Sequence, residues 1–194
     1  MTSAQWNIPG SILLAVAISS CTSGPRRADL IASLRASYAP VHEMEIVVSA
    51  GVTLNEYSPR VTDELLKFKS TEDSCKEVAV NLSDASLKSQ AAQVCQHLST
   101  AMDAYVVAKD YFGDTHETDL DPFEPGKNNV VDGSTYEDLH ARFPSIQASP
   151  SNGVAESPSS TYWRGDVLQA LWKVATQEGQ TAKEMIDKLA QSEK

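Results

Sequence analysis

Hydrophobic residues recur at intervals of three and four along most of this chain, a spacing that places them on one face of an α-helix. The first such series follows residue 26 and consists of Leu30, Ile31, Leu34, Tyr38, Val41, Met44 and Val48. Pro40 interrupts the series, so we expect either a kink there or a new helix with Pro40 in its first turn. Gly51 is the expected stop.

A second helix is expected to begin at the capping box Thr53-Leu54-Asn55-Glu56, in which the side chains of Thr53 and Glu56 bond to each other's backbone amides. Ser58-Pro59, just beyond it, is an alternative start. From either start the helix runs toward Lys69. Residues 71–83 are mixed in character, and we interpret them as containing a short helix around residues 75–80.

The strongest periodic segment ends at Gly113, and its apolar positions alternate spacings of four and three. They are Leu87, Ala91, Val94, Leu98, Ala101, Tyr105, Ala108 and Phe112. This seam is typical of a helical bundle, because it needs partner helices to cover it.

The last helix is predicted over about residues 161–191. Its apolar positions are Leu168, Leu171, Ala175, Ala182, Met185 and Leu189, with Trp172 and Ile186 alongside. The phase is preserved across Gly179, which should weaken this helix by about 1 kcal/mol relative to alanine without ending it. No segment of useful length alternates with a period of two, so we predict an all-α fold, an up-and-down bundle of about four long helices.

A long connection, residues 113–160, precedes the last helix; it is acidic first and then rich in Pro, Gly, Ser and Asn. Inside it we expect one short helix over residues 135–143. The capping box Ser134-Thr135-Tyr136-Glu137 opens this helix, and Pro144 closes it. A connection of this length is either functional or disordered, and the sequence leaves both alternatives open.

Residues 12–18 form an apolar run that is shorter than the roughly 20 residues of a transmembrane helix but suits an export signal. The run leads into Ile18-Ser19-Ser20-Cys21, which resembles the lipobox of bacterial lipoproteins. That resemblance implies a signal peptide over residues 1–20 and a diacylglycerol on the Cys21 sulfur. A lipidated tether, residues 21–26, would then precede a bundle domain over residues 27–194. The alternative is a cytosolic protein with an apolar N-terminal helix.

The resemblance to lipoproteins also implies a location. Thr22 follows the lipidated cysteine, and lipoproteins with a non-acidic residue there commonly reach the outer membrane, so we expect the domain on its periplasmic side, held by the lipid. The body loosely resembles uncharacterised exported all-helical bacterial proteins. It does so through Gly51-Val52-Thr53 before Glu56-Tyr57, the Ala101/Tyr105/Ala108 step and the Trp172/Ala175 step. This second resemblance implies no activity.

The net charge is −10, and no charged side chain lies in the first 20 residues, so the domain that follows carries all of it. An acidic surface repels phosphate backbones and therefore disfavours nucleic-acid partners.

With Cys21 lipidated, Cys75 and Cys95 remain as a pair in an oxidising compartment, and we predict a disulfide between them. In the chain-entropy model its loop contributes about 3 kcal/mol. Two buried reduced thiols are the alternative if export is wrong.

Oxygen ligands crowd the start of the long connection, at Asp114, His116, Glu117, Asp119, Asp121 and Glu124. Their spacing fits no EF-hand loop, so we interpret them as a hydrated acidic loop, with Asp114, Glu117, Asp119 and Asp121 as weak candidates for calcium. Glu137 and His140 form a Glu-x-x-His step, but a di-iron bundle needs a second one. We therefore predict no metal centre and no cofactor.

No motif for a catalytic nucleophile, haem attachment or a phosphate-binding glycine loop occurs in the sequence. Arg164-Gly165-Asp166 matches a tripeptide that adhesion receptors bind, but we expect it to enter a helix with Asp166 near the positive end. The larger aromatic residues are expected in the core or seam, with an aromatic-lined ligand groove as the alternative. They are Trp163, Trp172, Tyr105, Tyr111 and Phe112.

These patterns favour a lipid-anchored, non-enzymatic protein of the cell envelope, a binding or structural module whose partners are the membrane and an envelope protein. A periplasmic protein that binds a small ligand or calcium through the acidic connection is the alternative. An enzyme is the third hypothesis, and it requires a pocket with several ionisable groups of shifted pKa.

Overall fold

The computed structural model describes residues 26–113, 129–151 and 161–191. Within these ranges the chain forms five helices and two short strands. They are α1 (Arg27–Ser49), α2 (Leu54–Val80), α3 (Ala85–Gly113), β1 (Val130–Asp132), α4 (Gly133–Arg142), β2 (Thr161–Trp163) and α5 (Arg164–Gln191). The predicted all-α bundle is confirmed.

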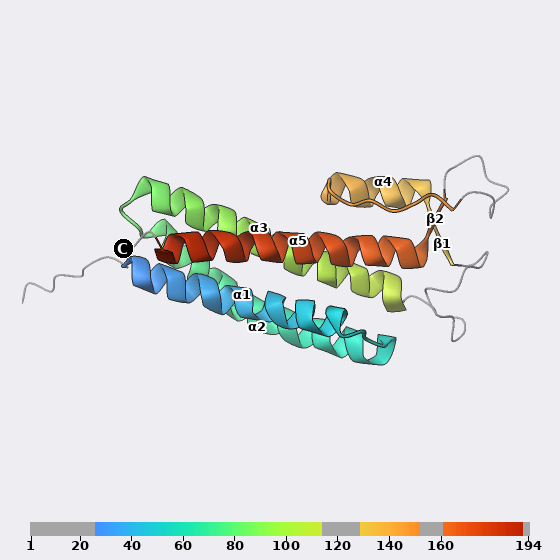
Figure 1. Cartoon of the computed structure of the whole chain (residues 1–194), viewed down its shortest axis with the longest axis horizontal. Coiled ribbons are helices and arrows are strands. Elements are labelled where there is room, and N and C mark those ends of the chain that lie inside the picture. Colours follow the sequence, from blue (N-terminus) through green and yellow to red (C-terminus); the bar gives the residue numbers. More distant parts are fainter. Residues whose placement is uncertain (1–25, 114–128, 152–160, 192–194) are drawn as a thin grey trace, which may run out of the picture.

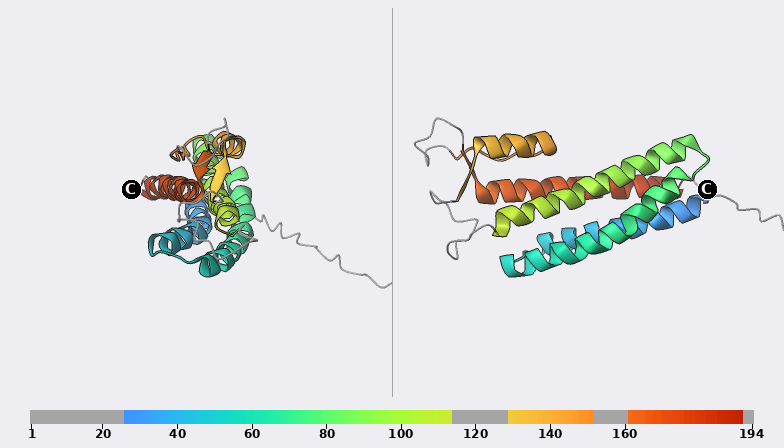
Figure 2. Two further views of the ribbon diagram at one scale, coloured as in Figure 1. Left: turned by 90° about the vertical axis from the view of Figure 1, so that its right-hand side faces the viewer. Right: turned by 180° about the vertical axis from the view of Figure 1, so that it is seen from behind.

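The four long helices run up and down, so that α1, α2, α3 and α5 alternate in direction (Figure 1). α5 packs mainly against α3 and also contacts α1, while α2 packs against α1 and α3. The short helix α4 lies with the two strands at the end of the bundle where α3 finishes and α5 begins (Figures 1 and 2). The first turn of α1 and the last turn of α5 lie together at the opposite end.

α1 continues through Pro40, so the expectation of a new helix at that residue is wrong. Pro40 is buried inside the helix, where packing compensates for the backbone hydrogen bond that proline cannot donate. The predicted stop at Gly51 is correct: its φ is +80°, and its N–H donates to the Val48 carbonyl at 3.2 Å. Glycine adopts this left-handed conformation without the steric penalty that a Cβ atom would bring.

The capping box at the start of α2 is confirmed, because Glu56 Oε2 accepts from the Thr53 N–H at 3.1 Å and from its hydroxyl at 2.8 Å. The alternative start at Ser58-Pro59 is wrong, since Pro59 lies inside the helix. The predicted end near Lys69 is also wrong. α2 continues to Val80, because a stripe of buried residues extends through the segment that we interpreted as mixed: Glu72, Cys75 and Ala79.

α4 begins two residues earlier than expected, and its cap is Asp132 rather than the Ser134 capping box. Asp132 Oδ1 accepts from the Thr135 N–H at 3.0 Å, and Oδ2 accepts from the Thr135 hydroxyl at 2.7 Å. The Ser134 hydroxyl also donates to Asp132. A carboxylate caps a helix at least as well as a serine hydroxyl, and this one lies at the end of a strand that fixes its position.

Two strands were not expected from the sequence. β1 and β2 pair antiparallel, with Val130 opposite Trp163, Val131 opposite Tyr162 and Asp132 opposite Thr161. Each strand is only three residues long, too short to show an alternating pattern. Residues 161–163 therefore belong to β2, and the last helix begins at Arg164 rather than at residue 161.

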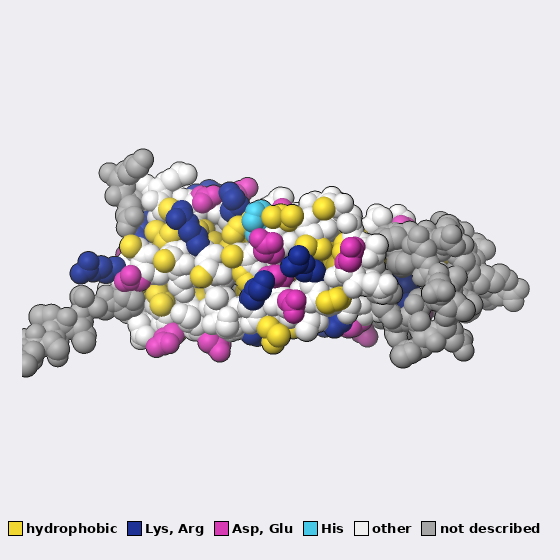
Figure 3. Space-filling view, turned by 90° about the horizontal axis from the view of Figure 1, so that it is seen from below, with side chains coloured by type: hydrophobic (Ala, Val, Ile, Leu, Met, Phe, Trp, Pro, Cys, Tyr) yellow, Lys and Arg dark blue, Asp and Glu magenta, His cyan; other side chains and the backbone are white. Residues whose placement is uncertain are grey.

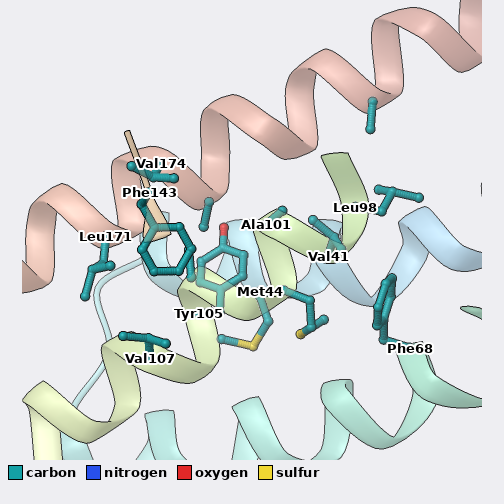
Figure 4. Close-up of a cluster of buried hydrophobic side chains, with 14 of the residues drawn as sticks. Val41, Met44, Phe68, Leu98, Ala101, Tyr105, Val107, Phe143, Leu171 and Val174 are labelled. Carbon is teal, nitrogen blue, oxygen red and sulfur yellow. The ribbon is translucent and has the colours of Figure 1, made fainter. Parts of the chain in front are cut away.

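The predicted seam of α3 forms the centre of the core (Figure 4). Every seam residue from Ala91 to Phe112 is buried, and Leu87 is half-buried. Leu98, Ala101 and Tyr105 lie among side chains of the other three long helices: Val41 and Met44 of α1, Phe68 of α2, and Leu171 and Val174 of α5.

Gly179 lies inside α5, as predicted, and its position has a packing reason. A Cβ atom added there would meet Val41 Cγ1 of α1 at 3.0 Å, closer than such contacts normally occur. The missing side chain therefore allows α1 and α5 to approach each other.

Cys75 of α2 and Cys95 of α3 are joined, and the predicted disulfide pairing is confirmed. Both residues are buried. Among the described residues, none of the helices is both long enough and apolar enough to cross a membrane.

Candidate functional site

Several residues singled out from the sequence lie outside the described residues. These are the signal peptide over residues 1–20, the lipobox cysteine Cys21, and the acidic candidates Asp114, Glu117, Asp119 and Asp121. Their expected roles remain predictions.

Glu137 and His140 lie on the exposed side of α4, as expected for a solvated face. Across the described ranges, no group of three or more His, Cys, Asp and Glu side chains is close enough to hold a metal ion. Arg164, Gly165 and Asp166 form the first turn of α5, and Gly165 is buried. The tripeptide is thus helical rather than displayed on an extended loop.

Tyr57 is the centre of an aromatic cluster between the helices. Its fully buried hydroxyl accepts from Trp172 Nε1 at 2.9 Å and donates to the Tyr105 carbonyl at 2.9 Å. The Tyr57 ring lies 5.4 Å from that of Phe112 and 5.5 Å from that of Trp172, measured between centroids. Burial raises the pKa of Tyr57 well above its ordinary value, so the phenol stays neutral. Of the aromatic residues expected in the core or seam, Tyr105 and Phe112 are buried in the core, and Trp172 and Tyr111 are half-buried against it.

A groove between α2 and α3 contains two adjoining hollows of about 300 and 270 Å³, which share Gln96 and Ser99. Glu72 lies at its floor with a side chain only 7% exposed. Its carboxylate accepts from Lys69 and Lys76 at 2.7 Å each and from Ser99 at 2.8 Å. Burial alone would raise the pKa of the Glu72 carboxyl. The three hydrogen-bond donors and the nearby Lys69 charge have the larger opposite effect, so the pKa is lowered to about 2. The carboxylate is fully engaged in joining α2 to α3.

A separate hollow, which we call the end cavity, lies where α3 ends, α5 begins and α4 covers them. Its volume is about 360 Å³. Three elements line it: Val107, Asp110 and Tyr111 from α3, Thr135, Leu139 and Arg142 from α4, and Arg164 from α5. It therefore has the size of a small-molecule site and a lining of mixed polarity.

Two arginines, Arg142 and Arg164, line the end cavity, and they differ in their hydrogen-bond partners. Arg142 donates to both carboxylate oxygens of Asp103, at 2.8 Å from Nε and 2.5 Å from Nη2, which holds α4 against α3. Arg164 has no comparable partner: its Nε and Nη1 are buried and lack any hydrogen-bond acceptor in the part of the chain that the structure describes. Two of the three guanidinium nitrogens of Arg164 are therefore without an acceptor among the described residues.

Tyr111 of α3 contributes a phenol hydroxyl to the residues that line the end cavity. Burial raises its pKa, Asp110, Asp132 and Asp138 raise it further, and the Arg164 charge opposes them. The hydroxyl consequently remains protonated at neutral pH and can donate a hydrogen bond to a ligand.

Sequence patterns did not reveal the end cavity, because its polar residues come from three separate elements. The one available signal is Arg164 at the first position of α5, where the helix dipole disfavours a positive charge. No protein-family model, curated protein or solved structure matches this chain.

Proposed function

We propose that this chain is a lipid-anchored protein of the cell envelope that acts by binding rather than by catalysis. The anchor is the diacylglycerol on Cys21, which would attach the bundle to the periplasmic side of the outer membrane. The resemblance of Ile18-Ser19-Ser20-Cys21 to a lipobox supports the anchor. The arrangement of the two ends of the bundle supports the binding role.

The contact between Arg27 and Leu189 carries this proposal. Arg27 Nε and Nη2 donate to the Leu189 carbonyl at 3.1 and 2.5 Å, so the start of α1 is tied to the end of α5. The end cavity lies at the other end of α5, because Arg164, the first residue of that helix, lines it. α5 has 28 residues, which at about 1.5 Å per residue gives a length of roughly 42 Å.

The segment from Cys21 to Arg26 is short compared with that length, because the five steps between these two residues span at most about 18 Å even when fully extended. A lipid on Cys21 would therefore keep the Arg27 end of the bundle close to the bilayer. The end cavity would lie on the side that faces away from the membrane, where a ligand can reach it.

The surface and the buried ionisable groups support binding in a cavity. Tyr57 and Glu72 are engaged in bonds between helices, which is a structural use of their chemistry. On the face shown in Figure 3, hydrophobic atoms are scattered among acidic and basic side chains. This distribution favours a small ligand over a large apolar docking surface.

Membrane fractionation of the native host tests the anchor. The wild-type protein should stay with the membranes through a high-salt wash, and Cys21→Ala should be released. The double variant Cys75→Ala/Cys95→Ala is the matched control, because it also lacks cysteines but should stay with the membranes. Retention of Cys21→Ala on the washed membranes would contradict the anchor.

A further inference from the structure

We propose that the end cavity binds a small carboxylate and that the Arg164 guanidinium is the group that pairs with it. The inference depends on the proposed function in one respect only, namely that the chain acts by binding. It does not require the lipid on Cys21.

The burial of Arg164 without an acceptor is the first argument. Its Nε and Nη1 are shielded from water and have no hydrogen-bond partner within the described residues. A buried cationic donor without a partner is costly, and such groups are rare in native proteins unless a ligand satisfies them. Arg164 is also part of the lining of the end cavity.

The charge of the neighbouring groups is the second argument. Arg142 is already paired with Asp103, and the Thr135 hydroxyl already donates to Asp132. The described groups still available to an anion are therefore Arg164 and the Tyr111 hydroxyl. Together they offer one positive charge and one neutral donor, which suit a singly charged oxyanion.

The acidic residues nearby distinguish a carboxylate from a phosphate. Asp110 lines the cavity, and Asp132 and Asp138 are close enough to raise the pKa of Tyr111. These carboxylates repel a doubly charged phosphate more strongly than a singly charged carboxylate. A planar carboxylate also matches the geometry of a guanidinium edge. The carboxylate could belong to a free small acid or to the C-terminus of a peptide.

NMR detection of the arginine Nε–H signals in the full chain tests the proposal. The chain is titrated with acetate at constant ionic strength, maintained with sodium chloride. We expect a saturable shift of the Arg164 Nε–H signal and at least tenfold weaker binding of inorganic phosphate. A dipeptide with a free carboxyl group and its amide form two further arms. Tighter binding of the free dipeptide than of acetate would identify a peptide end as the source.

Variants separate a binding role of Arg164 from a structural one. Arg164→Gln should abolish the response to acetate, whereas Arg60→Gln, at an exposed position on α2, should leave it unchanged. Without acetate, Arg164→Gln should unfold at the same denaturant concentration as the wild type or a higher one, because it removes two buried donors, Nε and Nη1, that lack an acceptor among the described residues. A structural Arg164 predicts a lower midpoint. Asp110→Asn offers a second test, since loss of a like charge should tighten acetate binding.

Two results would overturn the carboxylate proposal: a signal that responds equally to chloride and acetate, or an acetate response that persists in Arg164→Gln. Neither result bears on the fractionation of Cys21→Ala. The anchor and the ligand can therefore fail independently.

Discussion

Trp172 Nε1 lies 2.9 Å from the Tyr57 hydroxyl, and this hydrogen bond connects α5 to α2 across the bundle. The same hydroxyl donates to the Tyr105 carbonyl of α3. One buried phenol thus links three of the four long helices and fixes their relative positions.

Replacement of Tyr57 by phenylalanine should therefore destabilise the fold by about 1 to 3 kcal/mol, because the bonds to Trp172 Nε1 and to the buried Tyr105 carbonyl are both lost. Urea unfolding measures the change. Tyr38→Phe is the matched control, since the Tyr38 hydroxyl makes an exposed 3.3 Å contact with His42 and bonds to no other described residue. It should cost less than about 0.5 kcal/mol. Equal losses in the two variants would show that the Tyr57 hydroxyl has no special role.

Gly179→Ala should lower the free energy of unfolding by about 1 kcal/mol, although alanine is the better helix former. The reason is the 3.0 Å approach of the added Cβ atom to Val41 Cγ1. In a Val41→Ala background the same change should become neutral or stabilising, because the obstructing methyl group is gone. A double-mutant cycle measured by chemical denaturation checks this coupling. Additive effects would exclude the close approach as the cause.

Removal of the disulfide by Cys75→Ala/Cys95→Ala should cost about 3 kcal/mol, the entropy that a loop of this size removes from the unfolded chain. The two cysteines are 20 residues apart. Unfolding of the wild type with and without dithiothreitol gives the same comparison without substitution. If the reductant leaves the wild-type midpoint unchanged, the crosslink contributes nothing to stability.

The Glu72 carboxylate should make the fold sensitive to acid. Its pKa of about 2 in the folded chain lies below the ordinary value of 4.5, so ionised Glu72 stabilises the fold above about pH 4.5. That contribution, about 1 to 2 kcal/mol after allowance for screening, is lost as the pH falls from about 4.5 to about 2. Glu72→Gln should flatten the stability profile in this window.

Glu77→Gln, at an exposed position of the same helix, is the control for acid sensitivity and should keep the wild-type slope. The free energy of unfolding is measured by urea titration at several pH values. Parallel profiles for the wild type and Glu72→Gln would mean that Lys69, Lys76 and Ser99 do not stabilise the carboxylate.

Much of the bundle could be predicted from the sequence because its signals are local. The α3 seam repeats its apolar spacing up to Phe112, and Thr53 and Glu56 form a cap within four residues. The second half of α2 was missed for a physical reason. Glu72 is charged, so the pattern assigns it to the surface, but donors from both helices allow it to be buried on the core stripe.

The end cavity could not be predicted in the same way. Its existence depends on where α4 packs, and that position is set by the pairing of Arg142 with Asp103 and by the strand pairing between Val131 and Tyr162. Both contacts join residues far apart in the sequence. In the sequence Arg164 is distinguished only as part of the Arg164-Gly165-Asp166 tripeptide, because burial of its Nε and Nη1 without an acceptor among the described residues depends on the folded chain.

The placement of the whole bundle depends on Cys21, and the mass of the mature N-terminus tests it most directly. The protein is isolated from the membranes of its native host, digested, and its N-terminal peptide is analysed by mass spectrometry. The account predicts a peptide that begins at Cys21 and carries a diacylglycerol on the sulfur. A peptide that begins at Met1, with Cys21 unmodified, would contradict it.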